Sequence, residues 1–232
     1  MEQALAIPEL IALGDRVAPV MLAHERTLPV AEEFTDLFVE GGLVRGRILT
    51  CTGLAATSLA LALVAPVVAA GSWLGIVDLP TIGLDAASEF GLPLERVVAI
   101  NSDRGDSRGA GNSSGSGDSG FGSEPDDRWA QRWPEVMAAA IDGFDVLLAR
   151  VPTGVNQSAM RKVATRVQRR GAVVVLLGDL GPAICDGVLH TEPMGWTGVG
   201  DGHGHLQQRS VVVQASGRRM PGRCRRELML PA

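Results

Sequence analysis

Apolar positions along this chain alternate between two periods, one typical of buried strands and one typical of helices. Short apolar runs almost free of charge predict strands at 47–52, 73–78, 96–100, 145–151 and 172–177. Near-continuous runs of this kind are typical of parallel strands that are covered on both faces. The last forty residues lose helical periodicity and predict glycine-spaced strands, notably at 209–214 and 225–230.

Helical spacing fills the intervals between the predicted strands. The expected helices are 34–38, 55–70, 84–90, 133–142 and 157–170. Pro134 suits the first turn of the fourth of these helices, and Asn156 and Gly171 are suited to begin and end the last. Strands and helices that alternate in this way predict an α/β fold with a mostly parallel central sheet flanked by helices, and antiparallel strands near the C-terminus.

Two segments fall outside that alternation. Residues 1–30 form an amphipathic helical segment whose stripe either caps the core or docks a partner, and its apolar members are Ile7, Leu10, Ile11, Val17 and Met21. Residues 102–127 are rich in Gly, Ser and Asp and hold one bulky apolar residue, Phe121. We expect a disordered insertion in a single domain that spans 31–232.

Charge is sparse and unevenly distributed. The net charge of −5 excludes a global cationic field. The C-terminal region is an exception, with six arginines against one acid, Glu227: Arg209, Arg218, Arg219, Arg223, Arg225 and Arg226. Guanidinium groups form bidentate contacts with phosphates, so this region is a candidate patch for DNA, for an acidic protein partner, or for neither.

The sequence also argues against a membrane-spanning protein, an exported protein and a metal-binding protein. The charge-free run 48–77 is long enough to cross a bilayer, but Gly53, Pro66 and Gly71 divide it into strand, helix and strand. The three cysteines lie far apart and the N-terminus is acidic, which favours a reducing cytoplasm without export. His203 and His205 lie in a glycine-rich segment that we expect to be a loop, so no metal site is expected.

The turn after the first long strand is the place where an open α/β sheet would hold a phosphate. Its polar candidates are Gly53, Thr57 and Ser58. A phosphate-binding loop also needs a lysine, but the chain's one lysine, Lys162, is about a hundred residues away, and no arginine lies between 47 and 96. Nucleotide hydrolysis here is therefore disfavoured, although nucleotide binding stays open.

The order of these segments resembles the RecA-type core. The resembling segments are 34–49, with its Gly41-Gly42-Leu43 and Gly46-Arg47 phrases, 74–78, 84–97, 144–148, 171–177 and 217–223. Within that superfamily, residues 196–206 are similar to the actinobacterial ImuA-prime type of accessory protein from the damage-inducible mutagenesis cassette of the SOS response.

The resemblance implies an ATPase site that this chain has lost. Beside the missing lysine, the catalytic glutamate of the family is replaced by Asp78, which we expect in a strand-end turn. Ala149 and Arg150 stand where the family's magnesium aspartate would end its strand, and a cation there repels a metal ion. The resemblance therefore implies a pseudo-ATPase without a cofactor.

The function implied by the resemblance is a non-catalytic adaptor in DNA damage tolerance and induced mutagenesis. Such an adaptor recruits or positions an error-prone translesion polymerase assembly through a catalytically inactive Y-family polymerase homologue, with non-specific DNA contact and no membrane contact. We expect it in the bacterial cytoplasm, at the nucleoid after damage. The alternative is an ATP-binding recombination-type enzyme, or a DNA-binding protein with a residual nucleotide site.

Overall fold

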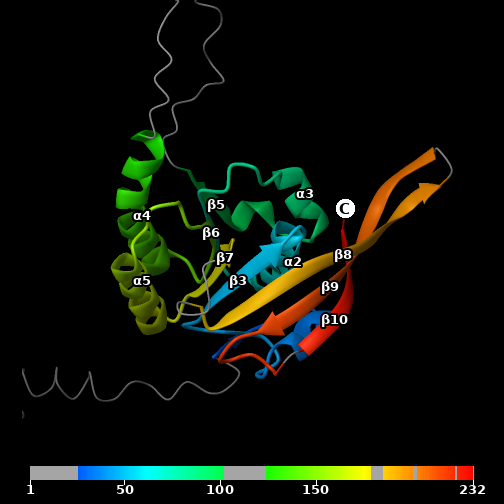
Figure 1. Cartoon of the computed structure of the whole chain (residues 1–232), viewed down its shortest axis with the longest axis horizontal. Coiled ribbons are helices and arrows are strands. Elements are labelled where there is room, and N and C mark those ends of the chain that lie inside the picture. The colour runs from blue at the N-terminus through cyan, green and yellow to red at the C-terminus, as the bar shows by residue number, and fades with distance from the viewer. Residues whose placement is uncertain (1–25, 102–123, 179–184, 201–202, 223, 232) are drawn as a thin grey trace, which may run out of the picture.

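An eight-stranded sheet forms the centre of the computed structural model, which describes residues 26–101, 124–178, 185–200, 203–222 and 224–231 (Figure 1). The spatial order is β10-β9-β8-β3-β7-β6-β4-β5. The bounds are β3 (Ile48–Gly53), β4 (Leu74–Val77), β5 (Val97–Ile100), β6 (Val146–Arg150), β7 (Val173–Leu177), β8 (Gly187–Gly200), β9 (His203–Ser216) and β10 (Cys224–Pro231). Pairing is parallel from β8 to β5, whereas β9 runs antiparallel to β8 and β10. The predicted α/β class is confirmed.

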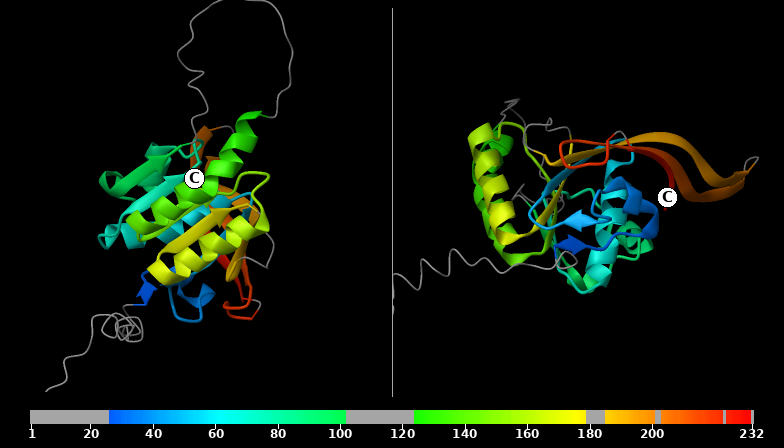
Figure 2. Two further views of the ribbon diagram at one scale, coloured as in Figure 1. Left: turned by 90° about the vertical axis from the view of Figure 1, so that its left-hand side faces the viewer. Right: turned by 90° about the horizontal axis from the view of Figure 1, so that it is seen from below.

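Helices cover both faces of this sheet (Figure 2). One face packs against α2 (Ala56–Ala69), α3 (Leu84–Glu89) and the 3₁₀ helix η1 (Glu32–Leu37). The other face packs against α4 (Glu124–Gly143) and α5 (Gln157–Arg170). The remaining elements are the short pair β1 (Thr27–Leu28) and β2 (Leu43–Val44) and the 3₁₀ helix η2 (Leu94–Arg96).

The strand β7 shows why its sequence is apolar at every position. Val173 and Val175 pack into the layer beneath α2, and Val174 and Leu176 pack into the layer beneath α4 and α5. All four side chains are almost completely buried. A strand buried on both faces needs no polar alternation, so the continuous apolar run predicted it correctly.

The charge-free run 48–77 divides as expected into β3, α2 and β4. Helix α2 is 14 residues long and buries apolar side chains around most of its circumference. No helix among the described residues is both long enough and apolar enough to cross a membrane.

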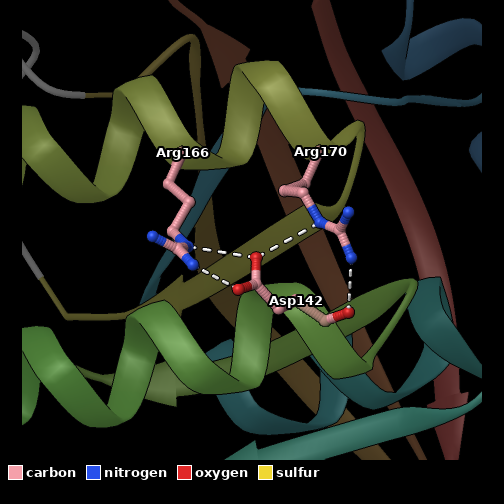
Figure 3. A network of polar contacts seen from close by, with 3 residues as sticks. All are labelled: Asp142, Arg166 and Arg170. Atoms are coloured by element: carbon pink, nitrogen blue, oxygen red, sulfur yellow. Dashed lines mark hydrogen bonds and ion pairs between the residues drawn. The ribbon is translucent and has the colours of Figure 1, made fainter.

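The helix α5 begins and ends where its sequence indicates. The Asn156 side chain accepts a hydrogen bond from the Ala159 amide at 2.8 Å, and Gly171 adopts the left-handed conformation with φ of 72°. Figure 3 shows how Asp142 of α4 holds α5: its carboxylate accepts hydrogen bonds from Arg166 and forms an ion pair with Arg170, which also donates a hydrogen bond to the Asp142 backbone carbonyl. The hydrogen bond from Arg166 holds the pKa of Asp142 below its usual value.

The prediction for α4 was wrong at its beginning. The helix begins at Glu124 rather than at Trp133, so Pro134 lies inside it and residues 124–127 are helical, not part of an insertion. The reason is tertiary: the Trp129 indole is buried and donates a hydrogen bond to Asp78 at 2.9 Å. The rest of the predicted insertion, 102–123, lies outside the described residues.

The glycine-rich segment near the C-terminus also differs from expectation. Instead of a loop, it forms the facing halves of β8 and β9, which extend as a two-stranded ribbon beyond the body of the domain (Figures 1 and 2). Residues 1–25, which hold the predicted docking helix, lie outside the described residues. The end of that predicted segment is not helical, because Thr27–Leu28 is a strand.

The interior of α2 is the first place to test the packing. Leu63 is fully buried, so Leu63→Ala leaves a cavity and lowers the free energy of unfolding by about 2–5 kcal/mol. Leu54→Ala removes the same atoms from a side chain that is 81% exposed and changes stability by less than about 0.5 kcal/mol. Urea unfolding of both variants measures this difference, and equal effects would contradict the packing.

Candidate functional site

The turn between β3 and α2 lies at the carboxyl edge of the sheet, at its central strand. Gly53 ends β3 with φ of 90° and lies opposite Thr191 of β8. A Cβ atom on Gly53 would lie 2.1 Å from the Thr191 carbonyl oxygen, so the close approach of β8 requires glycine here. The turn lies between a strand and a helix as the sequence predicted, but the sequence did not show which residue closes it.

The Thr191 hydroxyl closes this turn from the neighbouring strand. Its Oγ1 accepts a hydrogen bond from the Ala55 amide at 3.0 Å and donates one to the Thr52 carbonyl at 2.9 Å. Thr191 is buried, with 2% of its surface exposed. An amide that a phosphate-binding turn would offer to an anion is thus bonded within the protein.

The other two predicted turn residues have different environments. Thr57 is exposed on the first turn of α2, whereas Ser58 is half-buried. The Ser58 hydroxyl accepts a hydrogen bond from Arg209 Nη2 at 2.6 Å. The Arg209 guanidinium also lies 4.8 Å from the centre of the Trp196 ring, a cation–π distance. Strand β9 therefore supplies a cation to the start of α2, 151 positions away in sequence.

The Arg209 guanidinium is partly buried between β9 and α2. Burial lowers the pKa of its guanidinium, which nonetheless stays ionised. Its Nε is a buried side-chain atom without a hydrogen-bond partner among the described residues. Sequence reasoning missed this placement, because only the pairing of β9 with β8 sets Arg209 beside Trp196.

The remaining positions of the implied ATPase site, Asp78 and Arg150, have different surroundings. Asp78 follows β4 in a left-handed conformation with φ of 53°, is 3% exposed and accepts the Trp129 hydrogen bond. This agrees with its expected place in a strand-end turn. Arg150 ends β6 with an exposed side chain. No group of three or more His, Cys, Asp or Glu side chains in the described ranges could hold a metal ion.

The buried cysteine of β3, Cys51, is unsuited to act as a nucleophile. Burial raises the pKa of the Cys51 thiol to about 12. Since the thiolate is the reactive form of cysteine, Cys51 is an unreactive core residue.

The five C-terminal arginines that the structure describes have different surroundings. Arg209 belongs to β9 and donates a hydrogen bond to Ser58 of α2. Arg218 and Arg219 line a groove at the amino edge of the sheet. Arg225 and Arg226 are successive residues of β10 and point to opposite faces, where they pair with Glu192 and Asp36. Arg223 lies outside the described residues. Arg218, Arg219, Arg225 and Arg226 lie at or beside the turn between β9 and β10, whereas Arg209 contacts the start of α2.

The closed turn predicts a specific loss of stability. Thr191→Val keeps the shape of the side chain but leaves the buried Ala55 amide without its acceptor, so it lowers the free energy of unfolding by about 1–3 kcal/mol. Thr197→Val makes the same change on the exposed part of β8 and has little effect. Chemical denaturation compares the two, and an unaffected Thr191 variant would show that the hydroxyl does not hold the turn.

Comparison with protein families gives one match. No curated protein matches the chain. The family model described as the MT3502 N-terminal domain matches residues 36–110 and 125–182, which together make up more than half of the chain. The match covers the strands β3 to β7 and the helices between them, including the closed turn. The chain therefore belongs to the family of the MT3502 N-terminal domain.

Proposed function

We propose that this chain is a non-catalytic RecA-like adaptor in DNA damage tolerance and induced mutagenesis, which recruits or positions an error-prone translesion polymerase assembly. The observation that carries the proposal is the turn after β3. Its Ala55 amide is bonded to Thr191, and no lysine reaches it. A turn that satisfies its own donor offers less to a phosphate.

The order of elements supports the RecA-like part of this proposal. The segments that resemble the RecA-type core occur along the chain as η1 and β2, then β3 with its turn and α2, then β4, α3 and β5, then β6 and β7. The strand that bears the turn lies inside the sheet with parallel neighbours on both sides. Such a position is where an open α/β sheet binds its ligand.

The ribbon of β8 and β9 supports a protein partner. It carries three exposed large apolar side chains, Met194, Trp196 and Leu206. Beyond Thr191 and Gln208 its two strands pair only with each other in the part of the chain that is described. Protein interfaces concentrate their binding energy in a few apolar or aromatic residues, so the ribbon offers the catalytically inactive Y-family polymerase homologue a place to dock. This role is exercised in the bacterial cytoplasm, at the nucleoid after damage.

A second candidate is an ATP-binding recombination-type enzyme. The observation in its favour is Arg209, which places a guanidinium at Ser58, at the start of the helix that would receive a phosphate. An arginine from β9 would then replace the lysine that the turn lacks. The two candidates differ in whether MgATP binds and is hydrolysed.

Nucleotide titration and steady-state ATPase measurement on the purified protein separate the candidates. We expect no saturable binding of MgATP and no phosphate release above the buffer rate, because the turn is closed by Thr191. Thr57→Ala and Ser58→Ala are expected to change nothing in either assay. Magnesium-dependent turnover that these substitutions abolish would establish the enzyme and refute the adaptor.

Direct binding to the purified inactive Y-family polymerase homologue tests the role of the ribbon. We expect the pair Met194→Ser and Leu206→Ser to weaken this binding at least about tenfold, since both side chains are exposed on the ribbon. The matched control is Val39→Ser with Leu84→Ser, which removes two exposed apolar side chains elsewhere and leaves binding unchanged. Absence of binding, or equal losses in both pairs, argues against docking through the ribbon.

A further inference from the structure

The helix α5 is the most strongly basic element that the structure describes. Its 14 residues contain five cations and no acid, and all five side chains are exposed: Arg161, Lys162, Arg166, Arg169 and Arg170. The opposite face of the helix is apolar and packs into the core through Met160, Val163 and Val167. The cations therefore lie together on the outer face of one rigid helix.

A groove of about 1180 Å³ lies on one side of this helix, at the amino edge of the sheet. Arginines from several separate parts of the chain line it: Arg26, Arg45, Arg47, Arg161, Arg218 and Arg219. Two carboxylates, Glu40 and Asp186, share the lining. The fold thus gathers cations that the sequence scatters between residues 26 and 219.

A second groove, of about 890 Å³, lies on the other side of α5, where α4 packs against it. Its cations are Lys162, Arg166, Arg169 and Arg170, and its acids are Glu135 and Asp142. Thr165 lines both grooves, so α5 forms a ridge between them. Together the two grooves hold ten cationic side chains and four carboxylates, a surplus of six positive charges in a chain whose net charge is −5.

The carboxylates hold some of these arginines in place and leave others available. Glu40 pairs with Arg47, Asp186 with Arg219, and Asp142 with both Arg166 and Arg170, as Figure 3 shows for the last of these. Asp145 pairs with Arg45. Five cations of the surface make no ion pair among the described residues: Arg26, Arg161, Lys162, Arg169 and Arg218. These five are available to an external anion.

The lining favours a phosphate backbone over a folded protein partner. None of the exposed large apolar side chains of the described residues lines either groove, whereas protein interfaces need an apolar or aromatic centre. Nine of the ten cations are arginines, whose planar fork matches phosphate oxygens. At 1.5 Å per residue α5 is about 21 Å long, which spans about six phosphates of one DNA strand at 3.4 Å each.

We propose that α5 and the two grooves beside it form a nucleic-acid-binding surface that contacts the phosphate backbone without reading sequence. The surface is distinct from the closed turn, because the larger groove opens at the amino edge of the sheet and the turn lies at the carboxyl edge. It also differs from the C-terminal arginine set, of which only Arg218 and Arg219 take part. The proposal does not depend on the adaptor function.

Fluorescence anisotropy with the full chain tests the proposal. The probes are fluorescein-labelled 30-base single strands and 30-base-pair duplexes of two unrelated sequences, titrated over a range of salt concentrations. We expect both sequences to bind equally, with an affinity that falls steeply with salt. The triple variant Arg161→Ala, Lys162→Ala and Arg169→Ala weakens binding at least tenfold and makes the slope against log salt shallower by about two to three.

A matched triple variant controls for net charge. Arg128→Ala, Arg132→Ala and Arg150→Ala removes three exposed positive charges that line neither groove. This control is expected to keep its affinity within about twofold. Equal losses in the two triples, or no binding by the unaltered chain at low salt, would overturn the proposal. Poly-L-glutamate that competes as well as DNA of equal charge would assign the surface to acidic proteins instead and overturn it as well.

Discussion

The hydrogen bonds of the Thr191 hydroxyl join the central strand of the sheet to the helix that follows it. They exist because Gly53 lets the backbone of β8 come closer than any side chain would permit. With β8 at that distance, one buried hydroxyl satisfies the Thr52 carbonyl and the Ala55 amide. A phosphate would need the same amide. The turn therefore lies where an open α/β sheet can hold an anion, and an internal side chain takes a bond that such an anion would take.

The same pairing decides where positive charge lies. Strand β8 carries Trp196 and pairs with β9, whose Arg209 is drawn toward Trp196 and Ser58 and away from solvent. On the face of the sheet that α4 and α5 cover, α5 and the two grooves beside it present cations to solvent, and several of these cations pair with carboxylates. A fold of net charge −5 can therefore show a strongly positive face. The closed turn and this positive face are separate features, one internal and one exposed.

The sequence correctly predicted the helices and strands that are determined by residues within the segment itself. The strand β7 is recognisable from its own apolar run, and the ends of α5 are recognisable from its capping residues, Asn156 and Gly171. The structure has these elements where they were expected. The first nine residues of α4 were missed because Trp129 is stabilised by Asp78, 51 positions earlier. The glycines of β8 and β9 indicated a loop because their pairing across the ribbon is not visible in either segment alone.

The candidate site was predictable only in part, for the same reason. Gly53 marks the turn in the sequence, since a strand followed by glycine and an apolar helix is a local pattern. Thr191 and Arg209 lie more than 130 residues away, and neither has a sequence context that points to the turn. The amino-edge groove collects Arg26, Arg45 and Arg218 from three connecting segments that carry no shared motif. Charge counted along the chain therefore missed the face around α5.

The arrangement of the exposed surfaces bears on how the proposed adaptor would act. The ribbon and α5 lie on opposite sides of the molecule (Figure 1). No residue of the ribbon lines either groove beside α5. Ligands that bind two such surfaces do not exclude each other, and the rigid sheet between them needs no conformational change to couple them. One ligand then raises the effective concentration of the other simply by holding it near, to about millimolar for a short connection. Such tethering requires stable surfaces and no nucleotide cycle, which is consistent with a turn after β3 whose Ala55 amide is bonded to Thr191.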